Sequence, residues 1–566
     1  MADNNWLLVA ALDFGTTYSG YAFSFRNSPN DIQTPQTWYS GSGSTASLKT
    51  STCVLLNPDK TLNSFGYEAE DIYADLASEN IHRNYFYFEH FKMKLHHDEQ
   101  LSRETILEDI LGKTVPAIDV FSMSIEYLKT HLMETLKNRL PNVTLSDVRF
   151  VLTVPAIWRD SAKEFMREAA EKAGLESKNL VLSLEPEAAS IHCKNIPAEK
   201  LSGGAGLTIF EAGTQYLIAD VGGGTGDFTV HERLSSGKLK EISKASGGAY
   251  GGINVNKKFF QFISDIMGAR AVKQLKSEEM SDFIDLVRNF EQKNYLIRLP
   301  ASLMEFATQN NPNFRKNAET MDLKGQVTFL QNKLKIDTAL MKSFFAESIQ
   351  SITTHIEGIL QSFPNVKHIL LVGGYGECLI LQDRVRKCFP KTNLIVPQDS
   401  GLAVLKGAVL FGHDLNIISE RILRYTYGTD TDARFDPAIH SKDRKYVDDY
   451  GVTRCKYSFS VLKKAGESIT SDGHKVTRIV AALRKNQSAL KYTILYTEKS
   501  DIVYINDDCK FLGKVNIPLT GNKDTNRECK ISIIFGLTEI RCEVTEMSSG
   551  KKVETTFEML EQQEYK

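Results

Sequence analysis

One local pattern occurs twice in this chain and limits its possible folds more than any other feature. An apolar run, Leu7 to Leu12, leads into Asp13-Phe14-Gly15-Thr16-Thr17, and a second run, Tyr216 to Ala219, leads into Asp220 and residues 221–227, VGGGTGD. Glycines let backbone amides approach phosphate oxygens closely, and threonine hydroxyls add further donors. Two matching copies favour paired phosphate-binding loops over two structural hairpins, with one loop from each half of a duplicated fold. The leading aspartates suit a hydrated magnesium ion.

Other phosphate-binding motifs do not fit. Gly112-Lys113-Thr114 has the ending of a P-loop, but Leu107 stands where that loop needs glycine and no apolar strand leads into it. The glycines of residues 222–226 lack the G-x-G-x-x-G spacing of a dinucleotide-binding turn. The chain is therefore predicted to contain neither a P-loop nor a Rossmann site.

The spacing of hydrophobic residues along the sequence changes near Asp414 and divides the chain into two parts. Before it, short apolar runs alternate with amphipathic helical segments, which is typical of α/β sheets covered by helices. Residues 161–174 are predicted to be a helix that starts at a capping box of Ser161 and Glu164 and ends at Gly174. A longer helix is expected from about Thr338 to Phe363, with a strand at residues 368–372 directly after it.

After Asp414 the period becomes alternating. Tyr457, Phe459 and Val461 are an example, and Leu490, Tyr492, Ile494 and Tyr496 are another. Such segments, separated by turns, predict an all-β sandwich in the last ~150 residues. With 566 residues in total, two to four domains are expected.

Composition excludes several classes of partner. The net charge is −2 and no long basic run occurs, so neither nucleic acid nor an anionic membrane is expected as the main partner. The chain has no apolar stretch of 18 residues and no signal-peptide pattern at its start. Its eight cysteines form no Cys-x-x-Cys and are predicted to be reduced thiols. A cytoplasmic protein is therefore expected.

A series of segments resembles the ATPase-domain motifs of the 70-kDa heat-shock proteins. In order, they are ALDFGTTYSGYAFSF, VRFVLTVPAIWRDSAKEFMREAAEKAGL, LEPEAAS, DVGGGTGDFTV, HILLVGGYGE and PQDSGLAVLKGAVLFG. The segments FEHFKMKLHH and GLAVLKGAVLFG are similar to the divergent 12A type of that family. The resemblance implies an α/β actin-like ATPase fold, with two lobes built on duplicated ribonuclease-H-like halves, over residues 1–415. It implies a β-sandwich resembling a peptide-binding domain over residues 416–566, and no helical lid is expected, because the chain stops nine residues after Phe557.

The resemblance also implies roles for individual residues. Catalytic roles fall on Lys92, Glu185, Asp220 and Asp13, and Asp13 and Asp220 would hold the magnesium. ATP or ADP would be bound by Gly15, Thr16, Thr17, Tyr18, Gly222, Gly223, Gly224, Thr225, Asp227, Glu291, Gly373 and Gly374. Pro155 matches a proline proposed to relay the nucleotide state between lobes.

The sequence departs from the family in four places. Glu377 stands where an arginine lies near the adenine, and Asn294 and Tyr295 stand where a lysine and an arginine normally embrace the adenosine. Gly248 replaces the threonine that faces the γ-phosphate, and residues 413–420 lack the leucine-rich linker that couples the domains. These departures predict weak base selectivity, slow hydrolysis and weak communication between domains.

The favoured hypothesis is an ATP-binding, slowly hydrolysing, magnesium-dependent, chaperone-like protein whose β domain binds an extended polypeptide or a protein partner. One alternative is a nucleotide-dependent scaffold that barely hydrolyses ATP, which the altered adenine pocket and Gly248 favour. A small-molecule kinase of the same fold would also suit the phosphate loops, but it leaves the β region unexplained.

Overall fold

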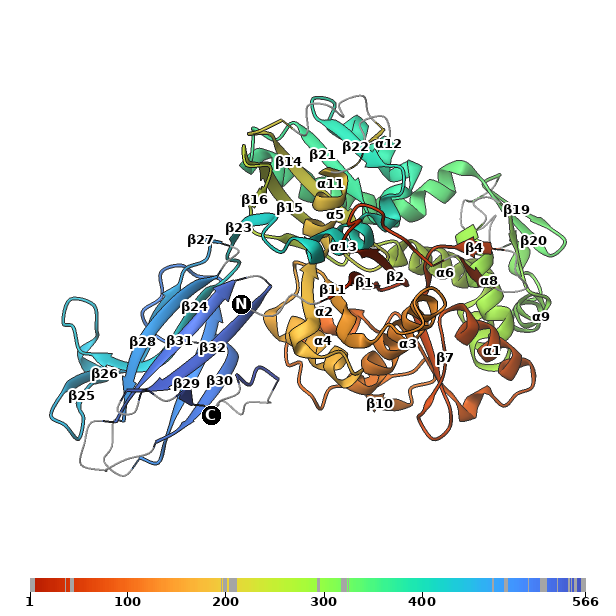
Figure 1. Ribbon diagram of the computed structural model, residues 1–566. Helices are drawn as coiled ribbons and strands as arrows, with labels where there is room; N and C mark the ends of the chain where they lie inside the picture. Colours follow the sequence, from red (N-terminus) through yellow and green to blue (C-terminus); the bar gives the residue numbers. More distant parts are fainter. Residues whose placement is uncertain are drawn as a thin grey trace.

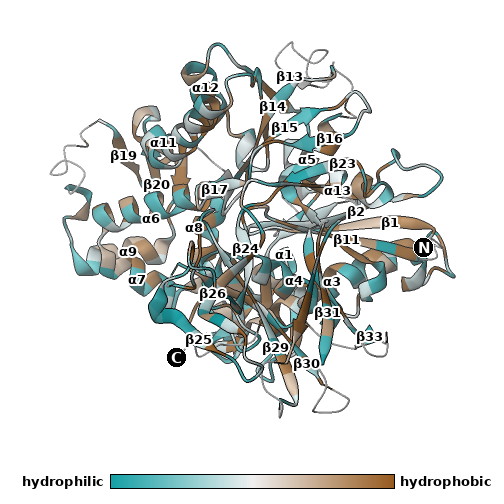
Figure 2. Cartoon of the chain, turned by 90° about the vertical axis from the view of Figure 1, so that its left-hand side faces the viewer, coloured by the Kyte–Doolittle hydropathy of each residue, from teal (hydrophilic) through white to brown (hydrophobic). Residues whose placement is uncertain are grey.

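The computed structural model describes residues 6–35, 37–40, 45–194, 196, 201–202, 211–292, 296–316, 323, 325–470, 473–482, 487–506, 508–519, 527–536, 538–547, 550, 552–553 and 557–560. Figure 1 shows an α/β part with two sheets and, beside it, a part made of strands. The strands inside the α/β part are largely apolar, and its helices carry polar outer faces (Figure 2). Within the described chain, no helix has both the length and the apolar character needed to cross a membrane.

The first half of the α/β part is built on a sheet with the strand order β12-β11-β1-β2-β5. Its central strand β1 (Leu8–Phe14) is parallel to β11 (Val148–Val154) and antiparallel to β2 (Tyr18–Phe25). β12 (Leu180–Leu184) extends the parallel side and β5 (Thr50–Ser51) the antiparallel side. All seven residues of β1 are buried, so its apolar run is a central strand with both faces covered.

The second half repeats this arrangement. Its central strand β14 (Gln215–Val221) is parallel to β21 (His368–Val372) and antiparallel to β15 (Gly226–Arg233). β22 (Asn393–Pro397) continues the parallel side and β16 (Leu239–Glu241) the antiparallel side. In both halves the predicted loop joins the central strand to its antiparallel neighbour, so the duplication inferred from the repeated pattern is present in the strand order.

The remaining elements of the α/β part complete the layers around these sheets. The helices are α1 (Tyr67–Ser78), α2 (Met93–His97), α3 (Ala117–Lys137), α4 (Asp160–Lys172), α5 (Glu185–Lys194), α6 (Ile253–Met267), α7 (Ala269–Glu278), α8 (Met280–Gln292), α9 (Ala301–Asn310), α11 (Thr338–Ser362), α12 (Leu379–Cys388) and α13 (Ala403–His413). The short strands are β3 (Trp38–Ser40), β4 (Thr45–Ser47), β6 (Cys53–Leu56), β7 (Leu62–Phe65), β8 (Phe86–Glu89), β9 (Ile106–Glu108), β10 (Thr114–Pro116), β13 (Leu201–Ser202), β17 (Ser246–Gly248), β18 (Leu296–Arg298), β19 (Val327–Leu330) and β20 (Lys333–Ile336).

Helices α5 and α13 cross between the two sheets (Figure 1). A methyl group at Gly407 of α13 would lie 1.6 Å from the carbonyl oxygen of Ala188 in α5, and one at Gly412 would lie 2.4 Å from Val9. Only glycine allows backbones to approach this closely. The motif GLAVLKGAVLFG is therefore explained by helix packing at the junction of the two halves.

Two expectations for α4 have different outcomes. Gly174 follows the helix with φ of +84°, so the predicted glycine stop is confirmed. The capping box is wrong, because the helix begins at Asp160 and Ser161 is already inside it. The Asp160 carboxylate accepts hydrogen bonds from the Tyr427 hydroxyl (2.7 Å) and from Lys163 (3.3 Å). A distant partner thus engages the first residue of this helix.

The segment after α13 does not behave as its sequence predicts. Residues Ile418–Ile422 form β23, which pairs in parallel with β16 and antiparallel with β27 (Ser468–Thr470). The missing leucine-rich linker predicts weak communication between the domains, yet the end of this segment is docked on the α/β part. Docking here uses main-chain hydrogen bonds and a buried ion pair between Arg421 and Glu187 (2.6 Å), neither of which needs a run of leucines.

From residue 424 onward the described elements are strands, turns and one short 3₁₀ turn. One sheet has the order β25-β26-β24-β29-β30, the other β28-β31-β32-β33, and an apolar cluster that includes Ile494, Val515 and Ile533 joins them. The strands are β24 (Thr426–Arg434), β25 (Lys445–Val447), β26 (Thr453–Lys463), β28 (His474–Ala481), β29 (Ala489–Thr497), β30 (Lys510–Pro518), β31 (Glu528–Gly536), β32 (Glu539–Glu546) and β33 (Lys552–Val553). All eight cysteines are free thiols, as predicted.

Candidate functional site

A cavity of about 780 Å³ lies between the two halves. It is lined by every residue that the sequence singled out for catalysis or nucleotide binding. These are Asp13, Gly15, Thr16, Thr17, Tyr18, Lys92, Glu185, Asp220, Gly222, Gly223, Gly224, Thr225, Asp227, Glu291, Gly373 and Gly374. They come from segments as far as 361 residues apart in the chain. The fold thus brings all of them together at one place.

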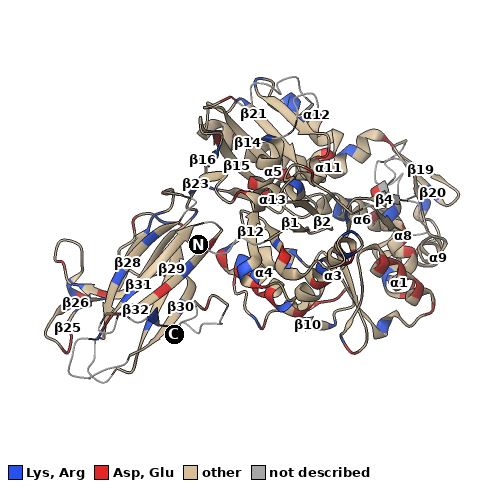
Figure 3. Ribbon diagram, viewed as in Figure 1, with Lys and Arg blue, Asp and Glu red and all other residues tan. Residues whose placement is uncertain are grey.

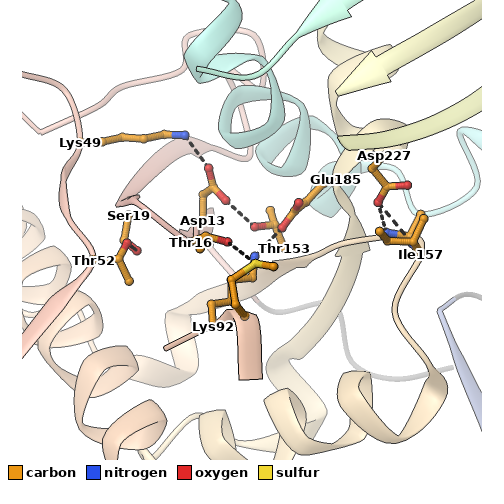
Figure 4. Close-up of polar contacts among 12 residues, drawn as sticks. Asp13, Thr16, Ser19, Lys49, Thr52, Lys92, Thr153, Ile157, Glu185 and Asp227 are labelled. Carbon is orange, nitrogen blue, oxygen red and sulfur yellow. Dashed lines mark hydrogen bonds and ion pairs between the residues drawn. The ribbon is translucent and has the colours of Figure 1, made fainter. Parts of the chain in front are cut away.

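The first loop joins β1 to β2, and Asp13 stands at its start. One carboxylate oxygen of Asp13 accepts a hydrogen bond from the Thr153 hydroxyl at 2.7 Å. The other oxygen accepts one from the ammonium group of Lys49 at 2.6 Å (Figure 4). Asp13 is 5% exposed, so both contacts are made inside the protein.

The second loop joins β14 to β15 in the same way. Asp220 lines the cavity at the end of β14, and Asp227 is its cross-strand neighbour in β15. One carboxylate oxygen of Asp227 accepts hydrogen bonds from the backbone N–H groups of Ala156 (2.6 Å) and Ile157 (3.3 Å), as Figure 4 shows. Its other oxygen is buried and has no partner among the described residues. Pro155 immediately precedes the two amides that hold Asp227.

The two loops touch each other. A methyl group at Gly223 would lie 2.3 Å from the Thr17 hydroxyl, and one at Gly224 would lie 2.7 Å from the Thr16 hydroxyl. The start of α6 braces the second loop, since the N–H of Ile253 donates to the carbonyl of Gly223 at 2.9 Å. The glycines are therefore needed for the approach of the loops, and their backbone amides and hydroxyls surround one small volume.

Lys92 immediately precedes α2 and points into the cavity. Its ammonium group forms an ion pair with Glu185 at 2.8 Å and lies over the ring of Trp158, 5.1 Å from the ring centre. Lys92 is 3% exposed. A lysine this deeply buried is not a solvated surface charge.

The buried carboxyl groups differ in their pKa values. Burial raises the pKa of Asp220 well above its ordinary value, and the neighbouring carboxylates of Glu185 and Asp227 add to the rise. Burial also raises the pKa of Asp227 to about 7, with Glu185 contributing. Burial raises the pKa of Glu185 as well, although Lys92 opposes it.

Asp13 is the exception. Burial acts to raise the pKa of its carboxyl group, but the ammonium groups of Lys49 and Lys92 and the Thr153 hydroxyl together outweigh burial, and the pKa lies below the usual value. Of these four acids, only Asp13 has a pKa below its ordinary value, although Glu185 is also bonded directly to a lysine. Asp220 and Asp227 lack such a partner in the cavity wall.

The charges around the two loops suit a divalent cation. Seven carboxyl groups and two ammonium groups (Lys49 and Lys92) line the cavity among the described residues; Asp13, Glu185, Asp220 and Asp227 lie at the loops, and Glu291, Glu377 and Asp399 elsewhere. When ionised, the carboxyl groups outnumber the two cations, so the lining offers an excess of negative charge to one Mg²⁺. The buried oxygen of Asp227 without a partner and the oxygen-only donor set also fit this ion. No three His, Cys, Asp or Glu side chains of the described chain are arranged to hold a metal directly.

The opposite end of the cavity is more apolar. Phe290, Met341, Phe345 and Tyr375 line it, and the rings of Phe345 and Tyr375 are stacked with centres 6.4 Å apart. Gly373 has φ of +85°, and a methyl group there would lie 2.5 Å from a carboxylate oxygen of Asp220. Glycine at this position therefore serves both the backbone conformation and the close contact.

Three further positions that the sequence singled out, Glu291, Glu377 and Gly248, are held by local contacts. The Asn256 amide donates to Glu291 at 2.7 Å, and the N–H of Gly401 donates to Glu377 at 2.9 Å. Gly248 of β17 pairs with Gly226 of β15, and a methyl group at Gly248 would lie 2.8 Å from the ring of Tyr250. Asn294 and Tyr295 lie outside the described residues.

The outer tips of the two lobes are in contact above the cavity. Arg288 of α8 forms ion pairs with Glu70 (2.8 Å) and Asp71 (2.7 Å) of α1. Met280 and Ile284 of α8 share an apolar cluster with residues of α1 and β6. Tyr67 of α1 and Glu291 of α8 line the cavity, so this bridge joins two helices that border it.

Sequence reasoning missed several lining residues. Lys49 has no local motif around it, so only the fold places it beside Asp13. Gly252 lines the cavity, and it was detectable in the sequence as part of the pair Gly251-Gly252 just before α6. A methyl group at Gly251 would lie 2.2 Å from the carbonyl oxygen of Gly223, which explains why this position must be glycine.

We expect replacement of Asp227 by asparagine to flatten the pH dependence of stability. The folded protein binds the Asp227 proton more tightly than the unfolded chain does, because the pKa rises from 3.8 to about 7. Stability from this group is present at low pH and is lost as pH rises towards 7. Without magnesium, raising the pH from 5.5 to 7.5 should lower the Tm of wild type by roughly 2–4 °C more than it lowers the Tm of the Asn variant. Equal pH slopes for the two proteins in thermal unfolding would contradict this.

Comparisons with known proteins find relatives of this chain. The sequence model of the family described as "Hsp70 protein" matches residues 57–426. Heat shock 70 kDa protein 12B of Homo sapiens is 33% identical over 98% of this chain and 91% of the relative. Heat shock 70 kDa protein 12A of Mus musculus is 33% identical over 98% of this chain and 92% of the relative. A chaperone protein HscA homolog of Acinetobacter baylyi is 23% identical over 50% of this chain and 38% of the relative.

Proposed function

Because this chain belongs to the Hsp70 family, we propose that it binds Mg-ATP between its two lobes and hydrolyses it slowly. The family implies an actin-like ATPase fold that binds nucleotide and polypeptide substrates. We assign the ATPase to residues 1–415 and a partner-binding β domain to residues 416–566. The free thiols and the family suggest a reducing, cytoplasmic setting.

One observation carries the proposal. Two equivalent loops, each led by a buried aspartate, meet in one cavity whose lining has more carboxyl groups than its two lysines. This arrangement offers backbone amides and hydroxyls to phosphate oxygens and leaves a negative charge for a divalent ion. Magnesium, when bound through Asp13 and Asp220, would neutralise phosphate charge during transfer.

The chain's own residues would act by position and charge. Lys92, fixed by Glu185 and Trp158, would face the terminal phosphate and stabilise the charge that grows there. The contact between α1 and α8 would keep water away from the loops, which strengthens these interactions. Gly248 supplies no hydroxyl to this site, which supports a slow rate.

Ile157 links the β domain to the site. The N–H of Ile157 donates to Asp227, while the carbonyl of Ile157 accepts a hydrogen bond from Arg424, just before β24. Arg167 and Glu539 form a further bidentate pair between α4 and β32. We propose that a polypeptide or protein partner bound to the β domain is sensed by the nucleotide site through these contacts.

A nucleotide-dependent scaffold is the second candidate. It is favoured by the Lys49–Asp13 pair, which already occupies an oxygen of a magnesium-binding aspartate, and by the missing hydroxyl at residue 248. A scaffold would bind Mg-ATP as tightly as an ATPase but would leave it intact.

Calorimetric titration of the full chain tests nucleotide binding. We expect magnesium-dependent binding of ATP, with an affinity for GTP within about 10-fold of that for ATP, which corresponds to about 1.4 kcal/mol. The reason is that the apolar end of the cavity has no lysine or arginine among the described lining residues, and Glu377 is bound to the backbone of Gly401. Binding of neither nucleotide would overturn the proposed function, whereas strong rejection of GTP would overturn only the selectivity.

A further inference from the structure

Lys49 is a cavity residue to which neither the sequence motifs nor the family resemblance gave a role. It lies in the short connection between β4 and β5, and its side chain reaches into the cavity to contact Asp13. Its side chain is 16% exposed, so it is largely enclosed yet not locked into the core. Figure 4 shows the extended lysine reaching the first loop from the side opposite Lys92.

The protein provides a fitted space for this lysine. Asp13 and Gly20 are cross-strand partners in β1 and β2, and a methyl group at Gly20 would lie 3.1 Å from Cγ of Lys49. The aliphatic stem therefore lies over Gly20, and the ammonium group reaches Asp13 across the strand pair. The absence of a side chain at residue 20 is what opens this path.

Comparison with the second half of the α/β part shows how the first half differs at the position of Gly20. Asp220 pairs across the strands with Asp227, as Asp13 pairs with Gly20, so Asp227 and Gly20 occupy equivalent positions. In the second half that position carries a buried acid; in the first half its space is filled by a lysine from another segment. The two phosphate loops therefore differ at this equivalent position: the second half has the carboxylate of Asp227, and the first half has the side chain of Lys49.

The Lys49 segment is also tied to the first loop. The N–H of Thr52 donates to the carbonyl of Thr17 at 2.8 Å, and the hydroxyls of Thr52 and Ser19 are 2.7 Å apart. Lys49 itself is steadied by Ser47, whose hydroxyl accepts from its N–H at 3.2 Å. Phosphate held at Thr17 would thus lie within the same hydrogen-bonded unit as the lysine.

We propose that Lys49 is a phosphate-binding residue whose ammonium group moves from Asp13 to the terminal phosphate of bound ATP. This inference rests on the proposed ATP site. The exchange gives the first loop its own cation and frees the Asp13 oxygen for the magnesium ion and its waters. Lys49 therefore favours a nucleoside triphosphate over a diphosphate, and it competes with magnesium for Asp13 when no nucleotide is bound.

The test compares Lys49→Met, which keeps the stem and removes the charge, with wild type in calorimetric titrations of Mg-ATP and Mg-ADP. Loss of a charge-assisted contact should weaken ATP binding roughly 10- to 100-fold. ADP binding should change less than about 3-fold, because ADP has no terminal phosphate for the lysine to reach. The magnesium concentration needed for half-maximal ADP binding should fall in the variant, since a competitor for Asp13 is gone.

Two further variants separate this role from a structural one. Lys49→Arg should restore most of the preference for ATP. Lys387→Met removes an exposed lysine that also forms a 2.7 Å ion pair, with Asp383, and should leave both affinities unchanged. The inference would be overturned if wild type binds both nucleotides and Lys49→Met has the same ATP-to-ADP affinity ratio and the same magnesium requirement as wild type. The proposed function would then still stand. If wild type bound neither nucleotide, both would fail.

Discussion

Replacement of Lys92 by alanine, or of Asp220 by asparagine, will slow ATP hydrolysis at least ~10²-fold in a folded protein. Lys92 is one of two cations among the described residues of the cavity wall, and its ion pair with Glu185 keeps it at the loops. Asp220 faces the same volume from β14, and burial with its neighbours raises its pKa. Both act on phosphate charge, so their removal should change kcat more than the affinity for ATP.

A double variant distinguishes loss of the Lys92 charge from misfolding as the cause of slow hydrolysis. Lys92→Met alone leaves the carboxyl of Glu185 buried without its cation, whereas Lys92→Met combined with Glu185→Gln keeps the pair neutral. The double variant should regain the thermal stability of wild type and remain slow in hydrolysis. If the double variant hydrolysed ATP at the wild-type rate, Lys92 would not be the catalytic lysine.

Replacement of Arg421 by methionine will undock β23 from the α/β part. Arg421 and Glu187 form a bidentate pair (2.6 and 2.8 Å) in which the side chains are 7% and 1% exposed. Glu241, whose pKa burial raises well above the ordinary value, adds a second acid near the same guanidinium. Removing one partner of a buried pair leaves an uncompensated charge, which costs about 3–5 kcal/mol.

The experiment measures chemical unfolding and limited proteolysis between residues 413 and 424. Arg421→Met should lower stability and expose this segment to cleavage. Replacing Glu187 by methionine as well should recover most of the loss, because an apolar pair of similar volume is often neutral. Exposed Arg478 provides a control substitution in the β domain. Wild-type stability and protection in Arg421→Met would contradict the docked arrangement.

The distribution of charge in the whole molecule fits an internal site. In the ribbon of Figure 3, basic and acidic residues are interspersed along both the α/β part and the part made of strands. The functional charges are instead gathered in the cavity, where low exposure makes each interaction stronger than in water.

The parts of the site that the sequence predicted are those with a local signature. Each phosphate loop is a strand, an acid and glycines within about ten residues, so the pattern is readable without the fold. Lys92 and Glu185 are 93 residues apart, and only the resemblance to a family suggested them. Lys49 has neither signature, and its role follows only from its contact with Asp13 across the sheet.

Tertiary contacts also explain the errors. The capping box at Ser161 was overridden because Asp160 begins the helix and contacts Tyr427 of another sheet. The alternation around Tyr457 fails because Tyr457 has φ of +56° and is 62% exposed, where a regular strand would turn it inward. The linker docks by strand pairing, which is invisible in side-chain composition.

The central claim is that the paired loops bind Mg-ATP and hydrolyse it slowly, and a single-turnover assay on the full chain tests it most directly. With protein in excess over labelled ATP and with magnesium present, we predict a slow single-exponential release of phosphate. Chelation of magnesium should abolish it, and Asp220→Asn should slow it at least ~10²-fold. Bound ATP that stays intact at the same level in wild type and in Asp220→Asn would contradict the account and leave a nucleotide-dependent scaffold.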